Sequence, residues 1–208
     1  MVSHDLRNPL NVIIGRTEFL MEAGEHDHLK AIERSCARME EIISDLLALS
    51  RTNREIAEPE SLPLASIANE SWSSVKTEGA TFDILVPDTT MIWAEPPRLR
   101  SLFENLFRNA CEHNERPLTV RVGLIETSAG NATTESLVGF YVEDDGGGIP
   151  AEERDRIFDH GYTTNTEGTG FGLSIVSRVV DSHDWTISIC EETKQGTRFE
   201  ITDVELEG

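Results

Sequence analysis

The sequence is poor in basic residues, and lysine is nearly missing from it. Its 208 residues include 18 Lys or Arg against 38 Asp or Glu, which gives a formal net charge of −20. Only Lys30, Lys76 and Lys194 are lysines. A protein with this charge does not present the positive potential that binding along nucleic-acid phosphates requires. The composition therefore argues against a nucleic-acid partner.

Long apolar runs and paired cysteines are also missing. The sequence has no stretch of about 18 apolar residues and no basic segment followed by an apolar one at its start, so we expect neither a membrane span nor a signal peptide. The three cysteines, Cys36, Cys111 and Cys190, are odd in number and widely spaced. They favour a reducing, cytoplasmic location and argue against a disulfide framework or a zinc cluster. Each is expected to be a small core residue.

Residues 1–53 have the pattern of two antiparallel helices. Apolar residues recur every three or four positions, as in a heptad repeat; they are Leu6, Leu10, Ile13 and Leu20, then Ile32, Cys36, Met39, Ile43 and Leu46. A single hairpin exposes this seam, so we expect two copies to form a four-helix bundle in a homodimer. The alternative is a monomer whose hairpin packs on its own second domain.

A second segment with a different period follows residues 52–63, a polar stretch with two prolines that is typical of a linker. We therefore place the domains at 1–55 and 56–208. Helices are predicted over 64–76, 97–114, 151–158 and 171–182, and strands over 81–86, 91–94, 118–127, 137–143, 185–190 and 197–201. Helices mixed with consecutive strands predict an α/β sandwich, in which helices cover a mixed sheet.

The helix predicted over 97–114 places Asn105 and Asn109 on one face, because they are four residues apart. Their amide oxygens, together with phosphate oxygens, suit Mg²⁺, which prefers oxygen ligands and keeps several waters. His113 continues the same face and can contact phosphate. Taken alone, the spacing is explained as well by two solvated asparagines.

Two glycine-rich segments follow that helix. In the first, a buried Asp144 at the end of a strand can accept a hydrogen bond from an adenine amino group, while Gly146 and Gly148 let the backbone approach the base. The second, residues 167–174, opens a helix whose free N–H groups and positive dipole end favour phosphate. Each segment taken alone also fits an ordinary glycine turn.

In this order, the elements resemble the sequence boxes of the sensor histidine kinases of two-component systems over nearly the whole chain. The H box is Ser3–Leu10, the N box 105–113, the G1 box Asp144–Pro150, the F box Ile157–Asp159, the G2 box Gly168–Leu173 and the G3 box Gly196–Thr197. The resemblance implies a dimerisation and phosphotransfer hairpin followed by a GHKL-type ATP-binding domain. That domain has the Bergerat-type fold, a mixed sheet with helices on one face, shared with gyrase, heat-shock chaperones and mismatch-repair ATPases.

The resemblance also implies residue roles. His4 matches the phosphoacceptor, Asp5 the acid that orients and activates its imidazole, and Asn8 the amide that positions a water for dephosphorylating the partner. The implied partner is a response regulator receiver domain, whose aspartate takes the phosphoryl group, and the implied cofactors are ATP and Mg²⁺, the metal held by Asn109 and Asn105. The implied nucleotide site consists of Asn105, Asn109, His113, Asp144, Gly146, Gly148, Ile149, Tyr162, Thr163, Thr164, Gly168, Thr169, Gly170, Phe171, Gly172, Leu173 and Thr197.

Three features depart from the family's pattern. Glu112 and His113 stand where the family often has a lysine followed by an aromatic residue. The lid, about residues 160–167, contains no lysine or arginine, so positive charge for the triphosphate must come from Mg²⁺, backbone amides and His113. Only three residues precede His4, whereas family members usually continue their first helix upstream into a sensor domain. We therefore expect either a fragment or a sensor that is a separate matter.

Two other functions stay open. ATPases of this fold place a glutamate base four residues before the magnesium asparagine; here that position is Asn105, which cannot take a proton from water. Glu104 is one residue off, which is about 100° around the helix. A nucleotide-binding pseudokinase is the third reading, because the lid has no cations. The sequence does not reveal the signal, the regulator or whether transfer occurs within or between subunits.

The acidic, lysine-poor and arginine-retaining composition further resembles that of proteins from halophilic archaea. At molar salt the Debye length falls to about 3 Å, so repulsion among the acidic residues is screened. An ordinary acidic bacterial protein is the alternative.

Overall fold

The structure, a computed structural model, describes residues 58–75, 77, 79–112, 118–128, 135–159, 162–163, 170–191 and 195–207. In the first fifty residues it describes positions 10, 12–14, 29, 32, 35, 36 and 39, and all of them are helical. The rest of the predicted hairpin lies outside the described residues, as do His4, Asp5, Asn8, His113, Thr164, Gly168 and Thr169. Within the described part, no helix is both long and apolar enough to cross a membrane.

A five-stranded mixed sheet forms the centre of the second segment. Its order is β2 (Thr81–Ile84), β4 (Thr119–Ser128), β5 (Glu135–Asp144), β7 (Thr197–Thr202) and β6 (Thr186–Ile189). β2 runs parallel to β4, and the other neighbours are antiparallel. The register pairs Asp144, the last residue of β5, with Thr197, the first residue of β7. The sheet therefore brings the G1 and G3 boxes, which are far apart in the chain, together where β5 ends and β7 begins.

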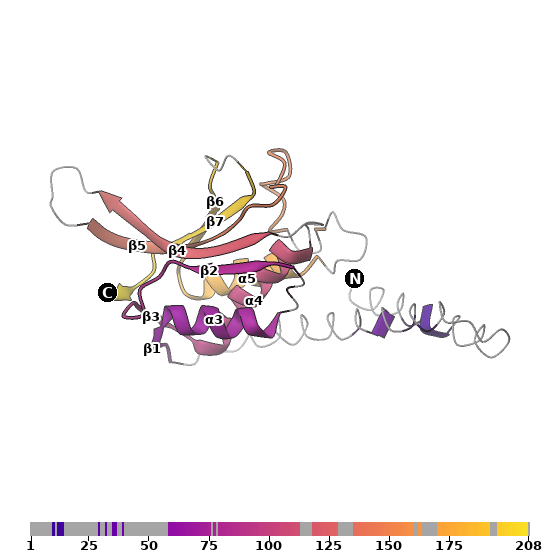
Figure 1. Ribbon diagram of the computed structural model, residues 1–208, viewed down its shortest axis with the longest axis horizontal. Coiled ribbons are helices and arrows are strands. Elements are labelled where there is room, and N and C mark those ends of the chain that lie inside the picture. Colours follow the sequence, from indigo (N-terminus) through magenta and orange to yellow (C-terminus); the bar gives the residue numbers. More distant parts are fainter. Residues whose placement is uncertain are drawn as a thin grey trace.

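Three helices cover one face of this sheet, as the sequence predicted (Figure 1). They are α3 (Leu64–Ser74), α4 (Pro96–Glu112) and α5 (Gly172–Ser182). α4 buries one side of its amphipathic pattern, including Leu99, Leu102, Phe103, Leu106 and Phe107. The predicted α/β sandwich is confirmed.

Aromatic rings join the helices to the sheet. Trp72 of α3 stacks on Phe82 of β2, with ring centroids 4.9 Å apart, and both rings contact Phe107 of α4. Phe103 continues this row to Phe140 of β5, at 5.4 Å. Such pairs contribute about 0.5–1.5 kcal/mol each beyond their buried area, so the row fixes α4 over the middle of the sheet.

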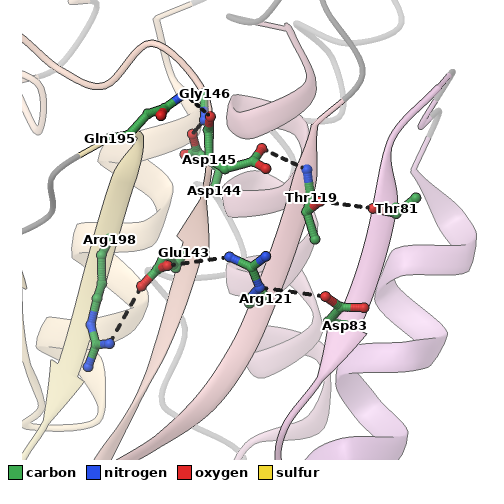
Figure 2. Close-up of polar contacts among 10 residues, drawn as sticks. All are labelled: Thr81, Asp83, Thr119, Arg121, Glu143, Asp144, Asp145, Gly146, Gln195 and Arg198. Atoms are coloured by element: carbon green, nitrogen blue, oxygen red, sulfur yellow. Dashed lines mark hydrogen bonds and ion pairs between the residues drawn. The ribbon is translucent and has the colours of Figure 1, made fainter.

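The opposite face of the sheet carries charges of alternating sign (Figure 2). Arg121 of β4 contacts Asp83 of β2 and Glu143 of β5, at 3.5 and 3.7 Å, and Glu143 also contacts Arg198 of β7, at 3.5 Å. Along β7 the buried residues Thr197, Phe199 and Ile201 alternate with half-buried ones. This alternation leaves one face for the core and one for solvent.

A small second sheet was missed by the sequence analysis. β1 (Glu60–Pro63), β3 (Met91–Ala94) and β8 (Leu206–Glu207) pair in the order β1-β3-β8. The predicted linker, 52–63, is therefore wrong for its last four residues, where the backbone pairs with β3 from Glu60↔Ala94 to Pro63↔Met91. Long-range pairing overrode a local composition that is typical of linkers.

The helix predicted over 151–158 is also wrong. The segment forms successive turns, in which the N–H groups of Glu153 and Arg156 donate to the carbonyls of Pro150 and Glu153. These are bonds between residues three apart. The N–H of Ile157 donates to the carbonyl of Glu153, four residues back, so bonds of both spacings mix and no continuous α-helix forms.

Candidate functional site

The carboxylate of Asp144 lies buried at the end of β5, with 6% of the residue exposed. Its Oδ1 accepts a hydrogen bond from the N–H of Gly146 at 2.8 Å, and Thr197 donates to it through its backbone and its side chain. Burial raises the pKa of Asp144, and these hydrogen bonds partly offset the rise. A carboxylate held this way is oriented to accept a further hydrogen bond.

Glycines let two loops approach this carboxylate. Gly148 and Gly196 have positive φ values, 77° and 82°. A Cβ at Gly196 would lie 1.8 Å from the carbonyl oxygen of Asp144, and a Cβ at Gly148 would lie 2.9 Å from the carbonyl oxygen of Gly196. Both positions therefore need glycine, for conformation and for space.

Asp145 fixes the same corner from its other side. Its Oδ1 accepts the backbone N–H of Thr119 at 2.8 Å, and its carbonyl accepts the side chain of Gln195 at 3.4 Å (Figure 2). The contacts tie the start of β4 and the turn before β7 to the end of β5. Asp145 thus supports the position of Asp144.

A second group of residues lies where α4 meets the start of α5. Asn105 is 5% exposed and donates from its Nδ2 to the carbonyl of Ser101 at 2.7 Å. Its Oδ1 lies 3.4 Å from the point that a Cβ on Gly172 would occupy, and Arg108 donates to it from Nη1 at 3.5 Å. Asn109, four residues after Asn105 on α4, is half-buried.

α5 begins beside Asn105, since its first residue, Gly172, borders the Oδ1 of Asn105. Its N-cap residue, Phe171, makes no side-chain capping hydrogen bond, and Gly170 before it has a φ of 69°. The N-terminus of an eleven-residue helix attracts anions through its N–H groups and its dipole. The arrangement can hold phosphate next to the amides of α4.

Two family descriptions match the chain. Residues 94–207 match "Histidine kinase-, DNA gyrase B-, and HSP90-like ATPase", and residues 1–55 match "His Kinase A (phospho-acceptor) domain". The chain belongs to the histidine kinase-, gyrase B- and HSP90-like ATPases. Both modules of a two-component histidine kinase are therefore present, and the predicted family is confirmed at this level.

A curated relative is similar over nearly the whole chain, and solved structures share the fold. Sensor histidine kinase ZraS of Escherichia coli K12 is 29% identical over 210 residues, which cover 96% of this chain and 43% of ZraS. Histidine kinase AdeS of Acinetobacter baumannii shares the fold, with a TM-score of 0.71 and 17% identity over 95% of each chain. Full-length ShkA, solved in complex with AMPPNP, has a TM-score of 0.62 and 22% identity over 99% of this chain and 45% of its own. The chain spans less than half the length of ZraS.

The ATPase-family domain brings six of the described residues that were expected at the nucleotide site into two groups. Asp144, Gly146, Gly148 and Thr197 share one corner, and Asn105 and Gly172 share the other. The carbonyl of Ile149 accepts a hydrogen bond from Arg154 at 3.2 Å, and the ring of Tyr162 lies 5.2 Å from the guanidinium of Arg156. Thr163 is exposed, Phe171 is buried and Leu173 is half-buried.

Two functional candidates on the ATPase-family domain escaped the sequence analysis. Asp145 was not singled out, and its position directly after the predicted adenine-binding acid was the available signal. Arg108 was not singled out, because a lone arginine on a helix has no motif; its spacing of three from Asn105 was the available signal.

The side chains of this corner that could bind Mg²⁺ are the amides of Asn105 and Asn109, through their oxygens. In the described part, no group of three His, Cys, Asp or Glu residues that could hold a metal occurs. The Oδ1 of Asn105 already contacts the guanidinium of Arg108, and a divalent cation beside a guanidinium is repelled. Asn109 lies further along the same helix face.

Proposed function

We propose that the chain is an ATP-dependent protein-histidine autokinase that phosphorylates its own His4 and passes the phosphoryl group to the aspartate of a response regulator. The observation that carries the proposal is the pairing of two features in one chain. A buried carboxylate, Asp144, and a phosphate-binding corner formed by α4 and α5 lie in the ATPase-family domain. Residues 1–55 match a phospho-acceptor domain.

In this proposal, the unprotonated imidazole nitrogen of His4 attacks the γ-phosphorus of ATP. The N–P bond forms while the bond from phosphorus to the β-phosphate oxygen breaks, and ADP leaves. Asp5 accepts a hydrogen bond from the other ring nitrogen, which fixes the tautomer and stabilises the charge that develops on the ring. Attack by the regulator's carboxylate on phosphorus then forms an acyl phosphate and returns the lone pair to His4.

The nucleotide-binding part of the proposal follows the two corners of the site. Asp144 accepts the adenine amino group, and Gly146, Gly148, Ile149 and Thr197 surround it. The phosphates lie at the start of α5, with Gly168 to Leu173 as their loop, and Asn109 holds Mg²⁺ against them. Asn105, His113, Tyr162, Thr163 and Thr164 complete the border of the site.

The position of Glu104 favours the kinase over an ATPase. A hydrolytic ATPase of this fold needs a carboxylate that takes a proton from the attacking water. The Oε1 of Glu104 accepts the hydroxyl of Ser74 on α3 at 2.8 Å, so this carboxylate is turned toward the neighbouring helix. Asn105, which does face the site, is an amide and is not a base.

The proposal includes the division into 1–55 and 56–208 and a homodimer formed by the hairpin. Leu10 is 44% exposed and Cys36 is exposed in the single chain, which supports a seam covered by a second copy. All three cysteines are free, which supports a reducing, cytoplasmic setting. We also keep adaptation to high salt and a phosphatase activity that depends on Asn8 as parts of the proposal.

Incubation with γ-labelled ATP and Mg²⁺ tests the proposed function. We expect label on the protein that is lost in acid and stable in base, as for phosphohistidine, and no label on His4→Gln, which should still bind nucleotide. Rapid release of free phosphate without protein label would instead support an ATPase. Neither product, with nucleotide still bound, would support a pseudokinase.

A further inference from the structure

The ATPase-family domain has few positive charges that could bind a triphosphate. Residues 56–208 contain 28 acidic and eleven basic residues, a net charge of −17, and the lid about 160–167 contains no lysine or arginine. Glu112 stands where a lysine is common in the family. A polyanion approaching this domain is repelled unless a cation lies at the site itself.

α4 carries three arginines, Arg98, Arg100 and Arg108. Arg98 forms an ion pair with Glu95, at 2.5 Å, at the start of the helix. Arg100 contacts Glu70 of α3, at 2.6 Å, and both side chains are about half exposed. Arg108 follows Asn105 by three residues and precedes Asn109 by one, so it lies on the flank of the asparagine face.

The amide oxygen of Asn105 contacts the Arg108 guanidinium and borders the start of α5. Asn105 donates its Nδ2 to the carbonyl of Ser101, and this bond fixes the amide so that Oδ1 points away from its own helix turn. That Oδ1 accepts the Nη1 of Arg108 at 3.5 Å and lies 3.4 Å from the Cβ position of Gly172. One amide oxygen therefore contacts the guanidinium and borders the first residue of α5.

We infer that Arg108 is the phosphate-binding cation of this nucleotide site and that Asn105 positions it. The inference rests on the proposed function, because it assumes that the site binds ATP. A guanidinium presents several N–H donors in a plane and can bind two phosphate oxygens at once. Together with the N-terminus of α5, it offers the polyphosphate donors from two helices.

Binding measurements on the full chain test this role. AMPPNP with Mg²⁺ reports the whole nucleotide, and adenosine reports the adenine corner alone. For Arg108→Gln we expect the affinity for AMPPNP to fall roughly 10- to 100-fold, because a charge-assisted hydrogen bond is lost, and the affinity for adenosine to change less than about twofold. Arg108→Lys keeps the charge without the bidentate fork and should fall between wild type and Arg108→Gln.

Arg100→Gln is the matched control, since it removes an arginine from the same helix at a position tied to α3. It should leave both affinities at the wild-type values. The inference is overturned if Arg108→Gln binds AMPPNP as wild type does, or if it loses AMPPNP and adenosine by the same factor, which would indicate a structural role. If the wild-type chain itself binds no AMPPNP, the proposed function fails together with the inference.

Discussion

The imidazole of His183 connects the end of α5 to the start of α4, because its Nε2 accepts the backbone N–H of Glu95 at 3.1 Å. Its Nδ1 lies 2.8 Å from the carbonyl of Val179, so Nδ1 carries the proton and donates it. The ring also stacks on Trp185, with centroids 4.4 Å apart. Only a neutral ring can accept at Nε2 while it donates at Nδ1.

We expect the stability of the protein to fall on acidification through this residue. Burial holds the pKa of His183 below its ordinary value of 6.5. The unfolded chain therefore binds more protons below about pH 6.5. The stability that neutral His183 contributes is complete above that pH and is lost as the pH falls toward the folded pKa.

Urea unfolding of wild type and His183→Gln at two pH values, about 7.5 and about 5.5, measures this contribution. The difference in unfolding free energy between the two proteins should shrink at the lower pH. Other titrating groups, Asp144 among them, are the same in both proteins and cancel in the difference. A difference that stays constant would show that His183 is not the group that titrates.

Replacing Asp144 by Asn should weaken nucleotide binding roughly 10- to 100-fold, since hydrogen bonds to charged groups contribute about 1.5–3 kcal/mol. Glu143→Gln is the matched control, because Glu143 is the preceding residue of β5 and faces Arg121 and Arg198 on the opposite side of the sheet. Calorimetry with AMPPNP should separate the two variants. Equal affinities would mean that Asp144 does not contact the base.

Replacing Gly196 by Ala should destabilise the protein and lower its nucleotide affinity, because the new Cβ would lie 1.8 Å from the carbonyl oxygen of Asp144. Gly79→Ala separates this clash from backbone strain, since Gly79 has a similar φ, 76°, with no atom within 4 Å of its Cβ position. Strain alone costs about 1–2 kcal/mol. Thermal unfolding should therefore show a larger loss for Gly196→Ala, and an equal loss in both variants would contradict the steric argument.

The proposed phosphatase activity makes a separate prediction. Asp5 and Asn8 are three residues apart, so a helix places them one turn apart. We expect Asn8→Ala to keep autophosphorylation and to slow the dephosphorylation of a phosphorylated receiver domain, which is measured as the rate of phosphate release. An unaltered rate would remove Asn8 from this role.

The regular elements were largely predictable, because their apolar patterns are local. The helix predicted over 97–114 is α4, Pro96–Glu112, and the strand predicted over 91–94 is β3. β1 was not predictable in this way, since Glu60–Pro63 has little apolar pattern of its own and becomes a strand by pairing with β3. The segment 151–158 shows the reverse error. Its composition predicted a helix, but its backbone forms successive turns.

The candidate site was predictable in its residue types and less so in its geometry. Asp144, Asn105 and the glycines stood out from their motifs. The contact of Gly196 with Asp144 joins residues more than fifty positions apart, and only the β5–β7 register reveals it. Arg108 becomes a candidate only once the orientation of the Asn105 amide is known, and that orientation depends on a single hydrogen bond to Ser101. No sequence pattern encodes such an orientation.

The charge distribution leads to a prediction about salt. Residues 1–55 contain ten acidic and seven basic residues, so the ATPase-family domain carries most of the net charge. Salt weakens attraction and repulsion alike, and the ion pairs on the outer sheet face are attractive. These pairs are partly exposed, with Arg121 and Asp83 at 36% and 53%, and such pairs contribute about 0–1 kcal/mol each. Their weakening is therefore small beside the relief of repulsion among the unbalanced acids.

We accordingly expect the melting temperature of the full chain and its affinity for AMPPNP to rise between dilute buffer and about 1 M potassium chloride, where charges more than about 3 Å apart are largely screened. Scanning calorimetry across this range measures the first quantity, and titration calorimetry at constant Mg²⁺ measures the second. Sucrose at matched viscosity is the control, because it stabilises compact proteins without screening charge. A melting temperature that stays flat or falls with potassium chloride would falsify the adaptation to high salt and would leave the kinase proposal intact.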